Sequence, residues 1–239
     1  MMNWLLQLTG LELTPTNHTD KLISGLGGLV AIAAMMWLTT WLVGPTAVVP
    51  VVASMGASAV LLFATPHGQL SQPWPLVVGH LASAAIGVTC ARLIAHPALG
   101  GALAVGLAIT VMYYGRCVHP PGGATALIAV LGGPALRDLG YGYVLLPVGL
   151  NVLLMLLVAV AFNYPFAWRR YPAGLLKPRR SGNSITRDDW GHALQQIGSL
   201  ADVTEDDLIE LHALAAEHAR TRQTARSRSV RTPTTTPAR

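Results

Sequence analysis

The chain has 239 residues, of which 52% are apolar and only 11% charged, and its formal net charge is +5 at pH 7. An ordinary soluble domain has about a quarter charged residues, so this composition excludes a conventional soluble globular protein. The charge is also unevenly placed. Before Trp168, only four residues are basic: Lys21, Arg92, Arg116 and Arg137. A long stretch with few charges followed by a basic tail predicts an integral membrane domain of residues 21–168 and a soluble extension.

Residues 1–20 are predicted to be a short lead-in before the membrane domain. Apolar runs then predict six segments, separated by glycine, proline and polar residues. The segments cover about residues 22–43, 48–64, 76–94, 98–114, 122–131 and 141–162, with loops at 65–75 and 135–140. The second and fifth segments are the short ones. The predicted fold class is therefore an all-α integral membrane protein.

The two short segments share a local sequence pattern. Gly56-Ala57-Ser58-Ala59 aligns with Gly123-Ala124-Thr125-Ala126, and Val78-Gly79-His80 aligns with Val148-Gly149-Leu150. Three segments per copy would place the two copies in opposite orientations across the bilayer. Inverted repeats with Gly- and Pro-interrupted helices commonly enclose a transport site. The sequence thus predicts two inverted three-helix repeats, with chance similarity among small residues as the alternative interpretation.

The region after the last segment predicts the orientation of the chain. An even number of segments places both termini on one side, and five basic residues follow the sixth segment: Arg169, Arg170, Lys177, Arg179 and Arg180. This excess predicts that both termini lie in the cytoplasm. Residues 169–220 are predicted to be a helical cytoplasmic tail, whose second helix carries an apolar stripe of Leu208, Leu211, Leu214 and Ala215. Residues 221–239, rich in Arg, Thr and Pro, are predicted to be disordered.

The stretch Arg116-Cys117-Val118-His119-Pro120-Pro121-Gly122-Gly123 concentrates the chemically distinctive residues of the membrane domain. Paired prolines fit the first turn of a helix, because their missing N–H groups would have had no partner there. The paired glycines leave neighbouring backbone N–H groups uncovered by side chains. A helix N-terminus of this kind attracts anions.

A channel or carrier for an anion must replace lost hydration with hydrogen-bond donors. Two short helices that point their N-termini toward the membrane midplane would supply backbone N–H groups and hydroxyls without a fixed charge. The predicted substrate-binding residues lie at these helices or are polar groups within apolar segments. They are Ser54, Gly56, Ser58, His80, His119, Gly122, Gly123, Thr125 and Asn151. Arg116 is predicted to be an entrance charge, since a permanent charge at the site would hold an anion too tightly.

Several of these residues also have a purely structural interpretation. Gly56 and Ala124 are better explained by close helix packing. The Ser58 and Thr125 hydroxyls can bond to their own helices. His119 is equally well explained as a helix cap, and interhelical hydrogen bonds account nearly as well for the polar groups inside the apolar spans.

The motif His119-Pro120-Pro121-Gly122-Gly123-Ala124-Thr125-Ala126-Leu127 resembles the signature of the HPP family of integral membrane proteins, named for this triplet. Gln72-Pro73-Trp74-Pro75 and Arg169-Arg170-Tyr171-Pro172 fit the same family, and the resemblance covers about residues 20–172. It implies a small anion-permeating protein with nitrite as the first substrate, because plastid and cyanobacterial relatives are known as nitrite transporters. Residues 184–220 resemble the linker that precedes CBS domains in many bacterial relatives, and no CBS domain is expected within this chain.

Two other functions stay open on the sequence alone. One is a membrane-embedded sensor or scaffold whose cytoplasmic tail binds a partner. The other is an intramembrane metal site or enzyme built from His80, His119, Cys90 and Cys117, although these lack CxxC or i,i+4 ligand spacing. We expect no enzyme activity, no catalytic residue, no metal and no cofactor. The expected partners are a small inorganic anion, the lipid bilayer and a second copy of the chain in a homo-oligomer, with no nucleic acid.

Overall fold

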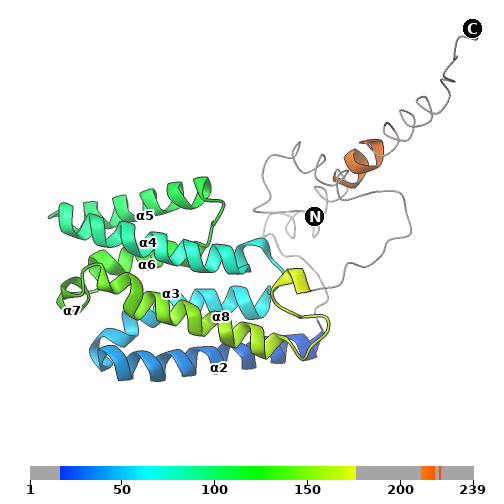
Figure 1. The fold of residues 1–239 in the computed structure, drawn as a ribbon, viewed down its shortest axis with the longest axis horizontal. Coiled ribbons are helices and arrows are strands. Elements are labelled where there is room, and N and C mark those ends of the chain that lie inside the picture. The colour runs from blue at the N-terminus through cyan, green and yellow to red at the C-terminus, as the bar shows by residue number, and fades with distance from the viewer. Residues whose placement is uncertain (1–16, 176–210, 219–220, 222–239) are drawn as a thin grey trace, which may run out of the picture. The chain divides into compact units, whose positions relative to one another are not determined.

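The computed structural model describes residues 17–175, 211–218 and 221 of the chain, which forms two compact units, residues 1–177 and 178–239. The described part of the first unit is built from helices that lie side by side (Figure 1). Four of them are long and apolar enough to cross a membrane, and two shorter apolar helices accompany them. The predicted all-α fold with about six segments is therefore confirmed.

The main helices of the first unit are α2 (His18–Val43), α3 (Pro45–Ala64), α4 (Pro73–Leu93), α5 (Pro97–Tyr114), α6 (Pro120–Leu131), α7 (Pro134–Asp138) and α8 (Leu150–Asn163). Short turns of helix at η1 (Gln69–Ser71), η2 (Val144–Gly149) and η3 (Ala173–Leu175) join or follow them. Each of α3 to α7 begins with a proline, whose fixed φ and missing N–H suit a helix start. The predicted segment starts therefore lie close to the observed ones.

The structure differs from the predicted segments and loops in three main respects. The first helix begins at His18, because the Asn17 side chain caps it by accepting from the Thr19 N–H at 3.3 Å. The predicted loop at 135–140 contains the short helix α7. The sixth segment is interrupted in η2, where Leu146 is extended (φ −130°, ψ 114°), since the following proline pushes it out of the α region. Residues 1–16 of the predicted lead-in lie outside the described residues.

The helix contacts agree with two inverted repeats in which α2, α3 and α4 correspond to α5, α6 and α8. If each helix is replaced by its counterpart in the other repeat, the α2–α3 contact becomes the α5–α6 contact, and both contacts occur. Likewise the α2–α8 contact becomes α4–α5, and the α3–α8 contact becomes α4–α6. The α3–α6 and α4–α8 contacts each map onto themselves and are also present. Corresponding helices run in opposite directions in Figure 1, as inverted copies require.

Helices α4 and α6 approach each other closely through glycines. A Cβ added at Gly87 would lie 2.5 Å from the Ala126 carbonyl oxygen and 2.7 Å from the Ala129 Cβ. A Cβ added at Gly122 would lie 2.9 Å from the Gly79 carbonyl oxygen. The two backbones therefore touch directly, as small residues allow between membrane helices.

Gly87→Ala is expected to lower the free energy of unfolding by about 1–3 kcal/mol, because overpacking this contact forces the two backbones apart. Gly106→Ala on α5 is the matched control, since nothing lies within 4 Å of an added Cβ there. Thermal unfolding of both purified variants in detergent measures the difference. Equal midpoints for the two variants would show that the α4–α6 contact is not tight.

In the second unit the structure describes a helix at residues 211–218, which belongs to the predicted second helix of the tail. Leu211 and Ala215 are buried and Leu214 is half-buried, as the predicted apolar stripe requires. Leu208, the first predicted tail helix and residues 222–239 lie outside the described residues.

Candidate functional site

Four polar side chains from α3, α4 and the start of α6 meet in the interior of the first unit. They are Ser58 on α3, His80 on α4, His119 immediately before α6, and Thr125 within α6. All four have 0% exposure. We call this group the buried histidine cluster. All four residues are among the predicted substrate-binding residues, and the structure brings them together.

Ser58 joins the two histidines of the cluster. Its Oγ lies 2.8 Å from His80 Nε2 and 2.9 Å from His119 Nε2. On the other side of the His80 ring, Nδ1 lies 2.7 Å from Thr125 Oγ1. The two imidazole rings meet edge to face, with centroids 4.9 Å apart. The four side chains thus form one continuous hydrogen-bonded chain.

The cluster lies where the two repeats meet. Ser58 and Thr125 occupy equivalent positions in the aligned copies, and they bond to opposite nitrogens of the same ring, His80. The position equivalent to His80 in the second copy is Leu150, which has no polar side chain. The two hydroxyls therefore come from equivalent positions of the two repeats. The imidazole that bonds to both of them is present in the first repeat and is replaced by Leu150 in the second.

One backbone carbonyl sets the direction of every hydrogen bond in the cluster. His119 Nδ1 lies 2.8 Å from the carbonyl oxygen of Leu70, which can only accept. Neutral His119 therefore carries its proton on Nδ1 and accepts the Ser58 O–H at Nε2. Ser58 must then accept from His80 Nε2–H, and His80 Nδ1 accepts the Thr125 O–H. This network assigns both tautomers and gives each ring nitrogen a partner.

The predicted pair of facing helix N-termini is wrong. Helix α3 begins at Pro45, and at 1.5 Å per residue its first turn is about 20 Å from Ser58. The reason is that Gly44-Pro45 starts a single continuous helix, so Ser58 lies in its C-terminal half. At the start of α6 the two prolines have no N–H, and the Gly122 N–H donates to the His119 carbonyl at 2.8 Å. The polar groups of the site come from side chains instead.

The other predicted polar residues lie outside the cluster's hydrogen-bonded chain. Ser54 Oγ donates to the Val51 carbonyl of its own helix at 3.1 Å. Asn151 Oδ1 accepts from Thr39 Oγ1 at 2.9 Å, whereas its Nδ2 is buried without a hydrogen-bond partner. Arg116 is exposed in the turn between α5 and α6, with a φ of 50°.

The predicted glycines serve different purposes. Gly122 is buried against Gly79 of α4, so its missing side chain permits packing and does not expose a donor. Gly56 has nothing within 4 Å of an added Cβ, so the close packing predicted there is not found among the described residues. Gly123 is half-buried near Val105 of α5.

Two residues of the site could not be identified from the sequence. Leu70 contributes its backbone carbonyl, which its side-chain identity does not reveal. Tyr143 is fully buried and its hydroxyl donates to the Thr125 carbonyl at 3.3 Å. The other hydrogen bonds of the cluster involve the two imidazoles, the two hydroxyls and the Pro121 carbonyl, which lies 3.3 Å from Thr125 Oγ1. Within the described residues no three His, Cys, Asp or Glu side chains gather as metal ligands would.

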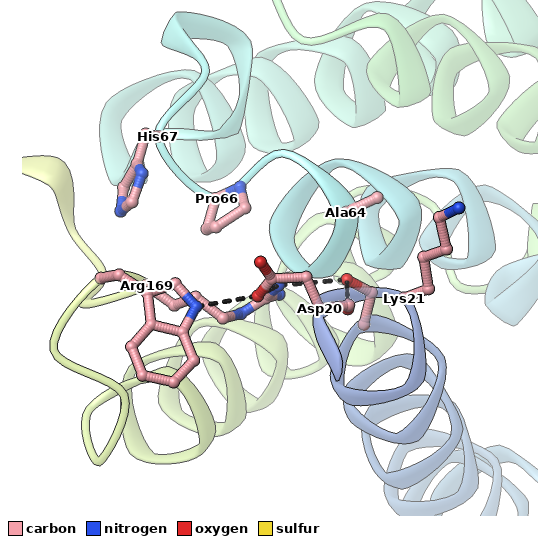
Figure 2. Close-up of a pocket in the computed structure, with 8 residues that line it drawn as sticks. Asp20, Lys21, Ala64, Pro66, His67 and Arg169 are labelled. Atoms are coloured by element: carbon pink, nitrogen blue, oxygen red, sulfur yellow. Dashed lines mark hydrogen bonds and ion pairs between the residues drawn. The ribbon is translucent and has the colours of Figure 1, made fainter. Parts of the chain in front are cut away.

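A second cluster of polar side chains lies at the end of the unit where α2 begins and α8 ends (Figure 2). Arg169 is only 5% exposed, and its Nη1 lies 3.3 Å from Asp20 Oδ1 and 3.2 Å from Ser24 Oγ. Its other terminal nitrogen donates to the Phe63 carbonyl near the end of α3. Arg169, the first residue after the predicted membrane domain, therefore bonds to side chains and backbone of helices within that domain.

A pocket of about 480 Å³ lies beside this ion pair. Its lining consists of Asp20, Lys21, Ser24, Ala64, Pro66, His67, Trp168 and Arg169. None of these residues belongs to the buried histidine cluster. The pocket and the cluster are therefore separate features of the unit.

Comparison with known proteins places the chain among membrane proteins. The family model for the HPP transmembrane region matches residues 13–172. A transmembrane protein of Dictyostelium discoideum is 43% identical over 123 residues, which cover 50% of this chain and 39% of that protein. A second transmembrane protein of the same organism is 39% identical over 125 residues, covering 51% and 44%. The matched region spans less than half the length of each relative, and no solved structure matches.

Proposed function

Because the chain belongs to the HPP transmembrane family and is an integral membrane protein, we propose that it moves a small monovalent anion across the membrane, with nitrite as the first candidate. The anion contacts the buried histidine cluster on its way. One observation carries the proposal: two imidazoles and two hydroxyls are fully buried together where the repeats meet. Polar groups inside a membrane are costly and commonly mark a transport pathway.

The donors of the cluster suit an anion that is held only briefly. Its N–H and O–H groups carry no fixed charge, so an anion can leave as readily as it enters. In the described arrangement these donors bond to other members of the cluster or to the Leu70 and Pro121 carbonyls, and none is exposed. An entering anion must therefore replace the histidine nitrogens as the acceptor of the hydrogen bonds that the Ser58 and Thr125 hydroxyls donate. Access to the cluster requires the surrounding helices to move.

Asn151 supports a pathway that continues beyond the cluster. Its buried Nδ2 has no hydrogen-bond partner, and it lies one turn after the break at Leu146. Interrupted helices of this kind line the substrate sites of several transporter folds. In this proposal the Asn151 amide is a second donor along the route of the anion.

The proposed orientation places both termini on the cytoplasmic side of a bacterial inner membrane. Lys177, Arg179 and Arg180 support it, because basic residues after a last span favour the cytoplasmic side. Arg169 adds little to this argument, since its charge is buried beside Asp20.

Thr125→Val is expected to lower nitrite flux by about tenfold while the protein stays folded. Valine has a similar shape but cannot donate a hydrogen bond to the anion, and a hydrogen bond to a charged group contributes roughly 1.5–3 kcal/mol. About 1.4 kcal/mol corresponds to a factor of ten. Uptake into proteoliposomes measures the flux of nitrite, and separate assays with nitrate, formate and chloride give the comparison.

Thr110→Val on α5 is the matched control, because its hydroxyl is exposed and bonds only to Gly106 of its own helix. Its flux should equal that of the unaltered protein. Equal flux in Thr125→Val would remove Thr125 from the pathway. If the unaltered protein moves none of the four anions, the transport proposal fails and a scaffold role is favoured.

A further inference from the structure

We propose that the buried histidine cluster is a proton relay and that one proton crosses the membrane with each anion. The inference rests on the proposed transport function and adds the ion to which transport is coupled. The observation that carries it is the unbroken, one-directional chain from Thr125 to the Leu70 carbonyl. Its four links measure 2.7, 2.8, 2.9 and 2.8 Å.

The chain can pass a proton without leaving any group unpartnered. A proton that arrives at His80 Nδ1 displaces the Thr125 hydroxyl, whose hydrogen has a second acceptor, the Pro121 carbonyl at 3.3 Å. His80 Nε2–H then moves to Ser58 Oγ while the Ser58 hydrogen moves to His119 Nε2. His80 ends neutral with its proton on Nδ1, and His119 ends as an imidazolium. One positive charge has moved from the first ring to the second, and no other atom or electron has been exchanged.

Release from His119 requires only a local movement. Its Nδ1–H points to Leu70, which belongs to η1 and is half-buried beside exposed Gln69. The turn is held by Ser71 Oγ, which donates to the Leu61 carbonyl at 3.0 Å, and by the Tyr171 hydroxyl, which donates to the Ser71 carbonyl at 2.8 Å. If these bonds open, the proton on Nδ1 reaches the surface of the unit.

In this proposal the two imidazoles carry the positive charge of the transferred proton. Helix α3 contributes Ser58, α4 contributes His80, and α6 contributes Thr125. The other titratable groups nearby are Tyr143, bonded to the Thr125 carbonyl, and the buried thiol of Cys117 in the turn before His119. Within the described part of the chain, the hydrogen bonds of the four cluster side chains involve no Asp, Glu, Lys or Arg.

Charge balance sets the ratio at one proton for each anion. Two imidazolium rings with centroids 4.9 Å apart would repel each other in a medium of low dielectric constant, so the pair takes up a single extra proton beyond the one that each neutral ring carries. One imidazolium and one monovalent anion together are neutral. A neutral pair is less costly to bury than either ion alone.

The test measures nitrite and protons in the same proteoliposomes, with a pH-sensitive dye enclosed. Nitrite entry should acidify the interior by one proton for each anion, and an inward proton gradient should drive nitrite uptake against its own gradient. Protein-free vesicles give the leak of nitrous acid through lipid. Nitrite flux that carries net charge and no proton would overturn the relay and leave the transport proposal standing. No protein-dependent flux of nitrite, nitrate, formate or chloride would instead overturn the transport proposal.

His119→Asn separates the relay from packing. The asparagine Nδ2 can keep the donation to the Leu70 carbonyl, but it cannot hold an extra proton. The proton-to-nitrite ratio should fall from one to near zero, and uphill uptake should be lost. Ser83→Ala on α4, buried and outside the chain of hydrogen bonds from Thr125 to Leu70, is the matched control and should keep the ratio at one. A ratio of one in His119→Asn would overturn the relay.

Discussion

Arg169→Met is expected to lower the free energy of unfolding by about 3 kcal/mol, the largest expected effect on stability, because it removes a buried guanidinium and leaves buried acceptors without a hydrogen-bond partner. The guanidinium joins three helices. It contacts Asp20 and Ser24 on α2, the Phe63 carbonyl of α3, and Asn163 Oδ1 at 3.4 Å at the end of α8. The Asp20 side chain is 32% exposed, so in the variant water replaces part of the hydrogen bonding that Asp20 loses. The buried Phe63 carbonyl and Asn163 side chain have no such replacement.

Two further variants separate charge from geometry at this position. Arg169→Lys should also be destabilised, since an ammonium group cannot reach these partners with the planar fork of a guanidinium. Arg170→Met is the matched control. Arg170 stacks over the Tyr164 ring at 5.5 Å, and its replacement should cost about 1 kcal/mol or less. Thermal unfolding in detergent measures all three. Equal losses for Arg169→Met and Arg170→Met would show that Arg169 does not join the helices.

His80→Leu is expected to lower nitrite flux by about ten- to a hundredfold, the largest expected effect on function. His80 is the only member of the cluster that bonds to both equivalent hydroxyls, so its loss interrupts the chain at its centre. Hydrogen bonds to a charged group contribute roughly 1.5–3 kcal/mol each, and about 1.4 kcal/mol is a factor of ten. Leucine should preserve the fold, because the site is enclosed by apolar helices.

His80→Gln provides the comparison for this variant. The glutamine amide can keep the donation to Ser58, so more downhill flux should remain than in His80→Leu. His96→Asn, at the exposed start of α5, should leave flux unchanged, since asparagine also caps a helix. Proteoliposome uptake of nitrite measures the series. Full flux in His80→Leu would place the anion pathway away from the cluster.

Much of the membrane fold can be predicted from local chemistry. Gly44-Pro45 and His96-Pro97 end one helix and start the next, because proline lacks the N–H that a continuing helix needs. The repeat is visible because small residues recur in both copies. The sequence does not indicate the break at Leu146, since a single proline within a long apolar run also occurs in continuous membrane helices.

The candidate site can be predicted in its residues but not in its geometry. Ser58, His80, His119 and Thr125 stand out because polar groups are rare in apolar spans. The arrangement predicted for them, at two facing helix N-termini, is wrong because Pro45 starts α3 far from Ser58. The predicted domain boundary also places Arg169 in the cytoplasmic tail, because the identity of this residue does not reveal which helices its side chain contacts.

Local sequence patterns are enough to predict a helical membrane domain of six segments in two related halves. The physical reason is local: hydrocarbon admits only backbones whose hydrogen bonds are satisfied within each helix. Local patterns do not show which polar groups meet in the folded chain. The bonds within the cluster join residues 22, 45 and 61 positions apart, so they depend on how α3, α4 and α6 pack. Their direction depends on a single carbonyl, at Leu70, whose position follows from the folded chain and not from the identity of its side chain.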